Sequence, residues 1–200
     1  MSMQAQLQSS TTRAIGDFEN FPEITQKSRE LLIARGINAL FPVQYESFKH
    51  VWSRKDLIVR DLTGSGKTLG FSLPLVEWLR KNKTLGSGKI QAMVLAPTRE
   101  LALQVAKEFN FQKHHEHEYN VLTVYGGVSI EDQTYQLRRG VDIFVGTTGR
   151  IKDHMERRNF DFSNLRTVIL DEADQMLKLG FKEDVELIMK TIKEKAPKDL

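Results

Sequence analysis

Two kinds of segment alternate along the chain. Short runs of β-branched and other apolar residues are followed, after a loop, by longer stretches in which apolar residues recur every three or four positions. The short runs predict strands and the longer stretches predict helices. The expected strands are 57–60, 92–96, 121–125, 141–145 and 167–170, and the expected helices are 67–81, 98–111, 130–138 and 151–157.

This alternation predicts an α/β fold with a parallel sheet and helices on both of its faces. In such sheets, ligands bind beyond the carboxyl ends of the strands. The loops that follow the expected strands read DLTGSGK, APTRE, YGG, GTTGR and DEAD. We therefore expect the functional residues of the chain to gather along one edge of the sheet.

The stretch VRDLTGSGKTLGF fits the phosphate-loop pattern G-x-x-x-x-G-K-[ST] except at its first position, where Asp61 replaces glycine. Backbone N–H groups at the start of the next helix would cradle a phosphate. Lys67 would neutralise the β and γ oxygens, and the Thr68 hydroxyl would ligate Mg²⁺. The predicted nucleotide-binding residues of this loop are Thr63, Gly64, Ser65, Gly66, Lys67 and Thr68.

An acidic pair, Asp171 and Glu172, follows the last expected strand. Asp171 is predicted to hold Mg²⁺ directly or through water, and Glu172 to act as general base on a water that attacks the γ-phosphate. Together with Lys67 these are the predicted catalytic residues. The alternative is an acidic helix start, which the helix dipole favours without any ligand.

The amino-acid composition excludes several classes of protein. The chain has 200 residues, 40% of them hydrophobic and 28% charged, which is typical of one folded domain and excludes a disordered chain. It contains no cysteine, which excludes disulfides, thiol nucleophiles and zinc–thiolate sites. The net charge of +3 permits a nucleotide or nucleic-acid partner. Because no apolar run reaches membrane-spanning length, we expect a soluble intracellular protein without a membrane partner.

The stretch KHHEHE, residues 113–118, has the composition of a metal cluster. It lacks a defined ligand spacing. We therefore interpret it as a solvated loop between a helix and a strand.

The motifs GSGKT, PTREL, GG, GR and DEAD, in that order, resemble the first RecA-like domain of a DEAD-box RNA helicase, from about residue 18 to the end of the chain. The stretches GDFENF, LFPVQYESF, KDLI, GRIKDH and DEADQML are similar to the nucleolar RNA helicase II/Gu subgroup. The resemblance implies a three-layer P-loop NTPase domain over residues 14–200. Residues 1–13 are polar and show no periodicity, which predicts a flexible tail before this domain. The resemblance also implies ATP and Mg²⁺ as ligands, RNA as partner, and a nuclear or nucleolar location.

The same resemblance implies two contacts to the base. Gln44, in LFPVQ, corresponds to a glutamine that reads one edge of adenine. Phe18 corresponds to an aromatic residue that stacks on the base, with Phe21 as the second candidate. The alternatives are a capping amide for Gln44 and core packing for both phenylalanines.

Further loops correspond to RNA-binding motifs of the family, which hold phosphates and sugars without reading sequence. Asp174 corresponds to a residue that couples the ATP and RNA sites. Outside the family, arginines such as Arg99 and Arg150 are more often surface ion-pair partners. The predicted RNA-binding residues are Pro97, Thr98, Arg99, Gly126, Gly127, Thr147, Gly149 and Arg150.

Two parts of the family's pattern are not in the sequence: the Ser-Ala-Thr motif III and the second RecA-like domain. We therefore expect a monomeric piece that binds nucleotide, hydrolyses it poorly and does not unwind RNA alone. A non-catalytic, nucleotide-gated RNA clamp is the alternative. A small P-loop GTPase or kinase is a further alternative. A GTPase is disfavoured because NKTL, at Asn82, fails the last position of the guanine motif Asn-Lys-x-Asp, and because Gln44 points to adenine.

Overall fold

A computed structural model describes residues 14–198, so the predicted tail 1–13 lies outside the described residues. Within that range the chain forms a four-stranded sheet with the order β2-β3-β1-β4, in which every neighbouring pair is parallel. The strands are β1 (Ala92–Ala96), β2 (Val121–Val124), β3 (Ile143–Thr147) and β4 (Thr167–Leu170).

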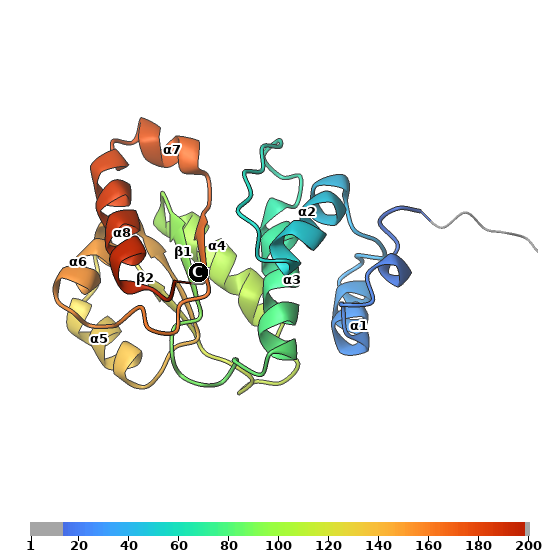
Figure 1. Ribbon diagram of the computed structural model, residues 1–200, viewed down its shortest axis with the longest axis horizontal. Helices are drawn as coiled ribbons and strands as arrows, with labels where there is room; N and C mark the ends of the chain where they lie inside the picture. Colours follow the sequence, from blue (N-terminus) through green and yellow to red (C-terminus); the bar gives the residue numbers. More distant parts are fainter. Residues whose placement is uncertain (1–13, 199–200) are drawn as a thin grey trace, which may run out of the picture.

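Helices cover both faces of this sheet, which confirms the predicted α/β architecture (Figure 1). One face packs against α3 and α4, and the other against α5 to α8. The bounds are α3 (Lys67–Lys81), α4 (Arg99–Phe111), α5 (Ile130–Arg138), α6 (Thr148–Glu156), α7 (Ala173–Lys178) and α8 (Lys182–Lys195). None of the helices among residues 14–198 is long and apolar enough to cross a membrane.

Strand β1 lies in the middle of the core, and all five of its side chains are buried. Met93 and Leu95 pack with the α5–α8 side, whereas Ala92, Val94 and Ala96 pack with α3 and α4. This is the two-residue alternation of a strand that is covered on both faces.

A helical segment precedes the sheet. It consists of the 3₁₀ helix η1 (Phe18–Asn20), α1 (Gln26–Ala34) and α2 (Pro42–Trp52), and it builds a third apolar cluster against α3. Local chemistry starts these helices. The Thr25 side chain accepts a hydrogen bond from the Ser28 N–H at the start of α1, and Pro42 occupies the first turn of α2.

Most predicted elements are confirmed, with small shifts at their ends. Predicted segments 67–81, 92–96, 130–138 and 167–170 have the predicted bounds. The helix predicted from residue 98 begins at Arg99, because the Thr98 hydroxyl caps it by accepting from the Leu101 N–H. The helix predicted from residue 151 already begins at Thr148, and the strand predicted over 141–145 lies at Ile143–Thr147.

The strand predicted over residues 57–60 is wrong: this segment has no regular structure, and the Ile58 side chain is 98% exposed. A strand forms only when a neighbour satisfies its backbone groups. Among residues 14–198, β4 is an edge strand whose outer side pairs with no strand, and Leu170 at its end is exposed. The run has the composition of a strand, but nothing in the described range pairs with it.

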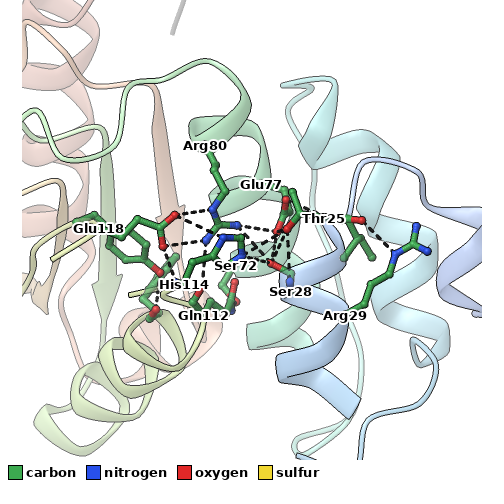
Figure 2. Close-up of polar contacts among 12 residues, drawn as sticks. Thr25, Ser28, Arg29, Ser72, Glu77, Arg80, Gln112, His114 and Glu118 are labelled. Carbon is green, nitrogen blue, oxygen red and sulfur yellow. Dashed lines mark hydrogen bonds and ion pairs between the residues drawn. The ribbon is translucent and has the colours of Figure 1, made fainter. Parts of the chain in front are cut away.

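A buried polar network joins the N-terminal helices to the rest of the fold (Figure 2). The carboxylate of Glu77, on α3, is 1% exposed and accepts hydrogen bonds from the Ser28 hydroxyl and the Thr25 N–H. Arg80 lies 2.7 Å from Glu77 and 2.6 Å from Glu118. The network therefore connects α1, α3 and the loop before β2.

The interpretation of residues 113–118 as a solvated loop is wrong at His114. Its Nε2 lies 2.9 Å from the Ser28 hydroxyl, and its backbone N–H donates to Glu118 (Figure 2). Burial, and then the nearby Arg80 charge, lower the pKa of His114. No group of three or more potential metal ligands occurs in the described part of the chain.

Candidate nucleotide and RNA site

Two glycines shape the phosphate loop before α3. Gly64 and Gly66 have φ values of 84° and 91°, a conformation that favours glycine. A Cβ atom on Gly66 would lie 2.3 Å from the Gln44 side-chain nitrogen, so a larger residue there would have to displace the Gln44 amide. The backbone thus reaches the start of α3 in the tight turn that a phosphate-binding helix start requires.

Lys67, the first residue of α3, bridges the loop and the acidic pair. Its Nζ donates to the carbonyl oxygens of Asp61 (3.0 Å) and Leu62 (2.9 Å), and lies 3.8 Å from Glu172 Oε1. The loop before α3 and helix α7 lie at the same end of the molecule (Figure 1). The tertiary structure therefore brings together two motifs that are about a hundred residues apart.

Asp61, the departure from the phosphate-loop pattern, is turned toward its own loop. Its Oδ1 accepts a hydrogen bond from the Leu62 N–H at 2.8 Å. That bond is the largest of the effects that lower the pKa of Asp61. The carboxylate thus has a role in holding the loop backbone.

The acidic pair lies at the end of β4. The Asp171 N–H donates to the Leu95 carbonyl, which fixes Asp171 beside the central strand, and Glu172 has a φ of 51°. Burial, and next the charge of Glu172, raise the pKa of Asp171. Two adjacent carboxylates, one of them buried, suit a hard divalent cation, because the cation would relieve their repulsion.

The amide of Gln44 is buried and engaged at both ends. Its Oε1 accepts from the Phe41 N–H (2.9 Å), which caps α2, and its Nε2 donates to the Gly66 carbonyl (3.1 Å). The capping alternative is therefore part of what Gln44 does, and the same amide ties α2 to the phosphate loop. Recognition of adenine by Gln44 stays a prediction.

The aromatic residues near the loop differ in exposure. Phe18 and Phe21 are buried in the third apolar cluster, so stacking on a base stays a prediction that requires Phe18 to leave this core. Phe41 is 57% exposed, and its ring lies 3.4 Å from where a Cβ of Gly66 would be. Sequence reasoning missed Phe41; an apolar residue directly before the proline of a helix start was the available signal.

Strand register places the predicted RNA-binding loops side by side. Ala96 of β1 is level with Thr147 of β3, and Val124 of β2 is level with Gly146 of β3. Because the strands are parallel, the loops after β2, β3 and β1 are neighbours on one edge, and Asp171 follows on β4. The sequence placed these loops on one rim, and the strand order decided which of them are neighbours.

Arg99 lies across the face of Tyr125. Its guanidinium carbon is 4.3 Å from the centre of the Tyr125 ring, a cation–π contact between the loops after β1 and β2. Gly126 and Gly127 follow Tyr125 and are exposed, and a Cβ added to either would meet no atom within 4 Å. Sequence reasoning missed Tyr125, although an aromatic residue directly before two glycines pointed to a support for the loop.

Arg150 points into the protein. Its side chain is 12% exposed and donates through Nη1 to the Val128 carbonyl (3.0 Å) and to Gln133 Oε1 (2.9 Å). Its direct contact with RNA stays a prediction, because in this structure Arg150 supports the neighbouring loop. Asp174 is exposed and pairs with Lys178 at 2.9 Å, so its coupling role also stays a prediction.

His154 is a buried residue of this region that sequence reasoning missed; a histidine three positions after Ile151 on the apolar face of α6 was the signal. Burial, and then the charge of Arg150, lower the pKa of His154 to about 4. An unfolded histidine titrates near pH 6.5, so acidification protonates the unfolded chain first. We expect the stability that neutral His154 contributes to be complete above pH 6.5 and to be lost as the pH falls toward 4.

Urea unfolding from pH 8 to 4.5 tests this expectation. The difference in unfolding free energy between the wild-type chain and His154→Gln should shrink as the pH falls, because glutamine does not titrate. His50→Gln, at an exposed position, is the matched control and should follow the wild-type curve. A difference that stays constant across this range would contradict the prediction.

Comparison with known proteins agrees with this arrangement. The family model described as DEAD/DEAH box helicase matches residues 41–199. The chain belongs to this family. A solved structure of a DEAD box protein from the hyperthermophile Methanococcus jannaschii matches 92% of this chain and 48% of its own, with 33% identity and a TM-score of 0.81. It confirms the RecA-like fold.

Two relatives in particular resemble the chain. The human ATP-dependent RNA helicase DDX50 is 48% identical over 87% of this chain, and the rat nucleolar RNA helicase 2 is 46% identical over 87%. These names are consistent with the nucleolar subgroup that the sequence motifs resemble. The chain spans only 23% and 22% of the length of these two relatives.

Proposed function

We propose that this DEAD-box domain binds Mg-ATP and RNA, and that it serves an ATP-dependent RNA helicase. The observation that carries the proposal is the distance of 3.8 Å between Lys67 Nζ and Glu172 Oε1, which joins the phosphate loop to the acidic pair at the end of β4. A glycine-rich turn without a phosphate role would not need an acidic partner from a distant strand.

The residues of the chain divide the chemistry among them. Mg-ATP supplies the phosphoanhydride bond and the cation that balances its charge. Lys67 and the N–H groups at the start of α3 would hold the phosphates, and Thr68 and Asp171 would hold the cation, Asp171 partly through water. Glu172 accepts a proton from the attacking water. Lys67 Nζ exchanges its bonds to the Asp61 and Leu62 carbonyls for phosphate oxygens.

RNA binding is proposed for the neighbouring loops after β1, β2 and β3. They offer backbone N–H groups, hydroxyls and Arg99, which bind phosphates and sugars of any sequence. A second RecA-like domain in the whole protein completes the site and supplies an arginine finger. By itself the chain should be a monomer with little ATPase activity and no unwinding activity. A nuclear or nucleolar location is proposed from the resemblance of the motifs to the nucleolar subgroup and from the name of the rat relative, nucleolar RNA helicase 2.

Calorimetric titration with Mg-ADP and, separately, Mg-GDP tests the proposal. We expect Mg-ADP to bind with a dissociation constant on the order of micromolar and Mg-GDP to bind much more weakly. Absence of binding by either nucleotide would contradict the proposed function. Equal binding of both would keep the phosphate loop and exclude adenine recognition.

Gln44→Ala separates the two roles of this amide. It removes the hydrogen bonds to the Phe41 N–H and the Gly66 carbonyl. We expect the preference for Mg-ADP over Mg-GDP to fall to about twofold or less, together with a stability loss of about 1 kcal/mol from the lost cap. Ser47→Ala, one turn further along α2, is the control and should leave the base preference unchanged. A preserved preference in Gln44→Ala would contradict adenine recognition by this residue.

A further inference from the structure

Hydrogen bonds from α5 and α6 hold the residues on both sides of the exposed Gly126–Gly127 pair. On one side, the Tyr125 carbonyl accepts a hydrogen bond from Gln133 Nε2 at 3.2 Å. On the other side, the Val128 carbonyl accepts from Arg150 Nη1 at 3.0 Å. A Cβ added to either glycine would meet no atom within 4 Å, and Gly127 has a φ of 82°, so we assign the shape of the loop to these two bonds.

Gln133, on α5, is the junction of this support. It is buried, and its Oε1 lies 2.9 Å from Arg150 Nη1 and 3.0 Å from His154 Nε2. Because Oε1 faces the Arg150 guanidinium and the His154 imidazole, the amide nitrogen of Gln133 faces the Tyr125 carbonyl. One side chain thus organises both of the bonds that bracket the glycines.

Together with Arg150, His154 holds that amide in its orientation. Its Nδ1 lies 2.9 Å from Asn159 Nδ2, and its Nε2 faces Gln133 Oε1. A neutral imidazole with its proton on Nε2 satisfies both partners: it accepts from Asn159 and donates to Gln133. The charged groups near it are Arg150, Asp153 and Arg157, all on or directly after α6, and from α5 it faces the neutral amide of Gln133.

We propose that Gln133 and His154 are positioning residues for RNA binding, which hold the Gly126–Gly127 loop and the Tyr125 platform beneath Arg99 in their binding shape. The inference rests on the proposed RNA-binding function of these loops. A loop that is already ordered loses less conformational entropy when it binds. Neither residue needs to touch RNA to affect its affinity.

The test uses this chain, a fluorescently labelled single-stranded oligouridylate, and Mg-ADP titrations of the same samples. Gln133→Leu keeps the approximate volume and removes both hydrogen-bonding ends. We expect RNA binding to weaken by ~10-fold. The affinity for Mg-ADP should stay within about twofold, because the phosphate loop belongs to another part of the site. Hydrogen exchange at the amides of residues 126–128 should become faster.

A pair of substitutions at His154 keeps the test decisive even if Gln133→Leu does not fold. His154→Phe keeps the ring but removes the donor, and should weaken RNA binding by ~5-fold or more. His154→Gln places an amide N–H near the position of Nε2 and should restore the affinity to within about twofold of the wild type. A purely structural role of the ring would produce the opposite order, with phenylalanine tolerated and glutamine not.

Gln112→Leu is the matched control. Gln112 is also a buried glutamine, and it donates to the Ser72 hydroxyl at 2.7 Å in the other polar network. The Gln112→Leu substitution should lower the free energy of unfolding without changing the RNA affinity. If both Gln133→Leu and His154→Phe leave the RNA affinity unchanged, that result would overturn this inference but not the proposed function. Absence of RNA binding by the unsubstituted chain would overturn the proposed function and, with it, the inference.

Discussion

Lys67→Ala should weaken the binding of Mg-ADP by on the order of 100-fold or more, because it removes the charged donor that faces the phosphates. In this structure the Lys67 ammonium is held by two carbonyl oxygens of its own loop and by Glu172. The two carbonyl oxygens therefore accept the bonds that phosphate oxygens would take over when nucleotide binds. Calorimetric titration of the wild-type and substituted chains measures the change directly.

Asp61→Asn is the matched control in the same loop. Because the Asp61 carboxylate accepts from the Leu62 N–H and an asparagine oxygen can do the same, we expect Mg-ADP affinity to change by about threefold or less. A gain of more than ~10-fold would show that the carboxylate repels the phosphates. Wild-type affinity in Lys67→Ala would contradict the assignment of this loop as a phosphate site.

Arg80→Ala should have the largest effect on stability, a loss of about 3–5 kcal/mol. The substitution leaves the Glu77 carboxylate buried without its cationic partner, and it also removes the bonds to Glu118 and the Gln112 carbonyl. These contacts connect the N-terminal helices, α3 and the loop before β2 (Figure 2). Urea unfolding at neutral pH measures the difference in unfolding free energy.

Adding Glu77→Gln to Arg80→Ala tests the cause. If an uncompensated buried charge dominates the loss, the double variant should be more stable than Arg80→Ala alone. Lys178→Ala, in the exposed pair with Asp174, is the control and should cost less than about 1 kcal/mol. A loss in Arg80→Ala no larger than in this control would show that the network contributes no more than a surface ion pair.

The sequence by itself determined the elements whose signals are local. Strand 92–96 and helix 67–81 were predicted with their observed bounds, because periodicity fixes which residues are buried and the glycine before Lys67 fixes where the helix begins. The order of residue types also predicted a phosphate loop before Lys67 and an acidic pair at Asp171, and the structure brings these two motifs together. Their chemistry depends on residue types in a fixed order, and that order is visible in a single sequence.

The tertiary structure decided those features that depend on contacts between residues distant in the chain. The apolar run at 57–60 has the residues of a strand but pairs with no strand among residues 14–198, although the outer side of β4 is open, and pairing depends on the neighbour as much as on the run. The order β2-β3-β1-β4 decided which loops are adjacent. Arg150 could be identified by its motif, but only packing showed that it points inward to Gln133. A residue type limits which contacts a side chain can make, and the surrounding fold selects which of them form.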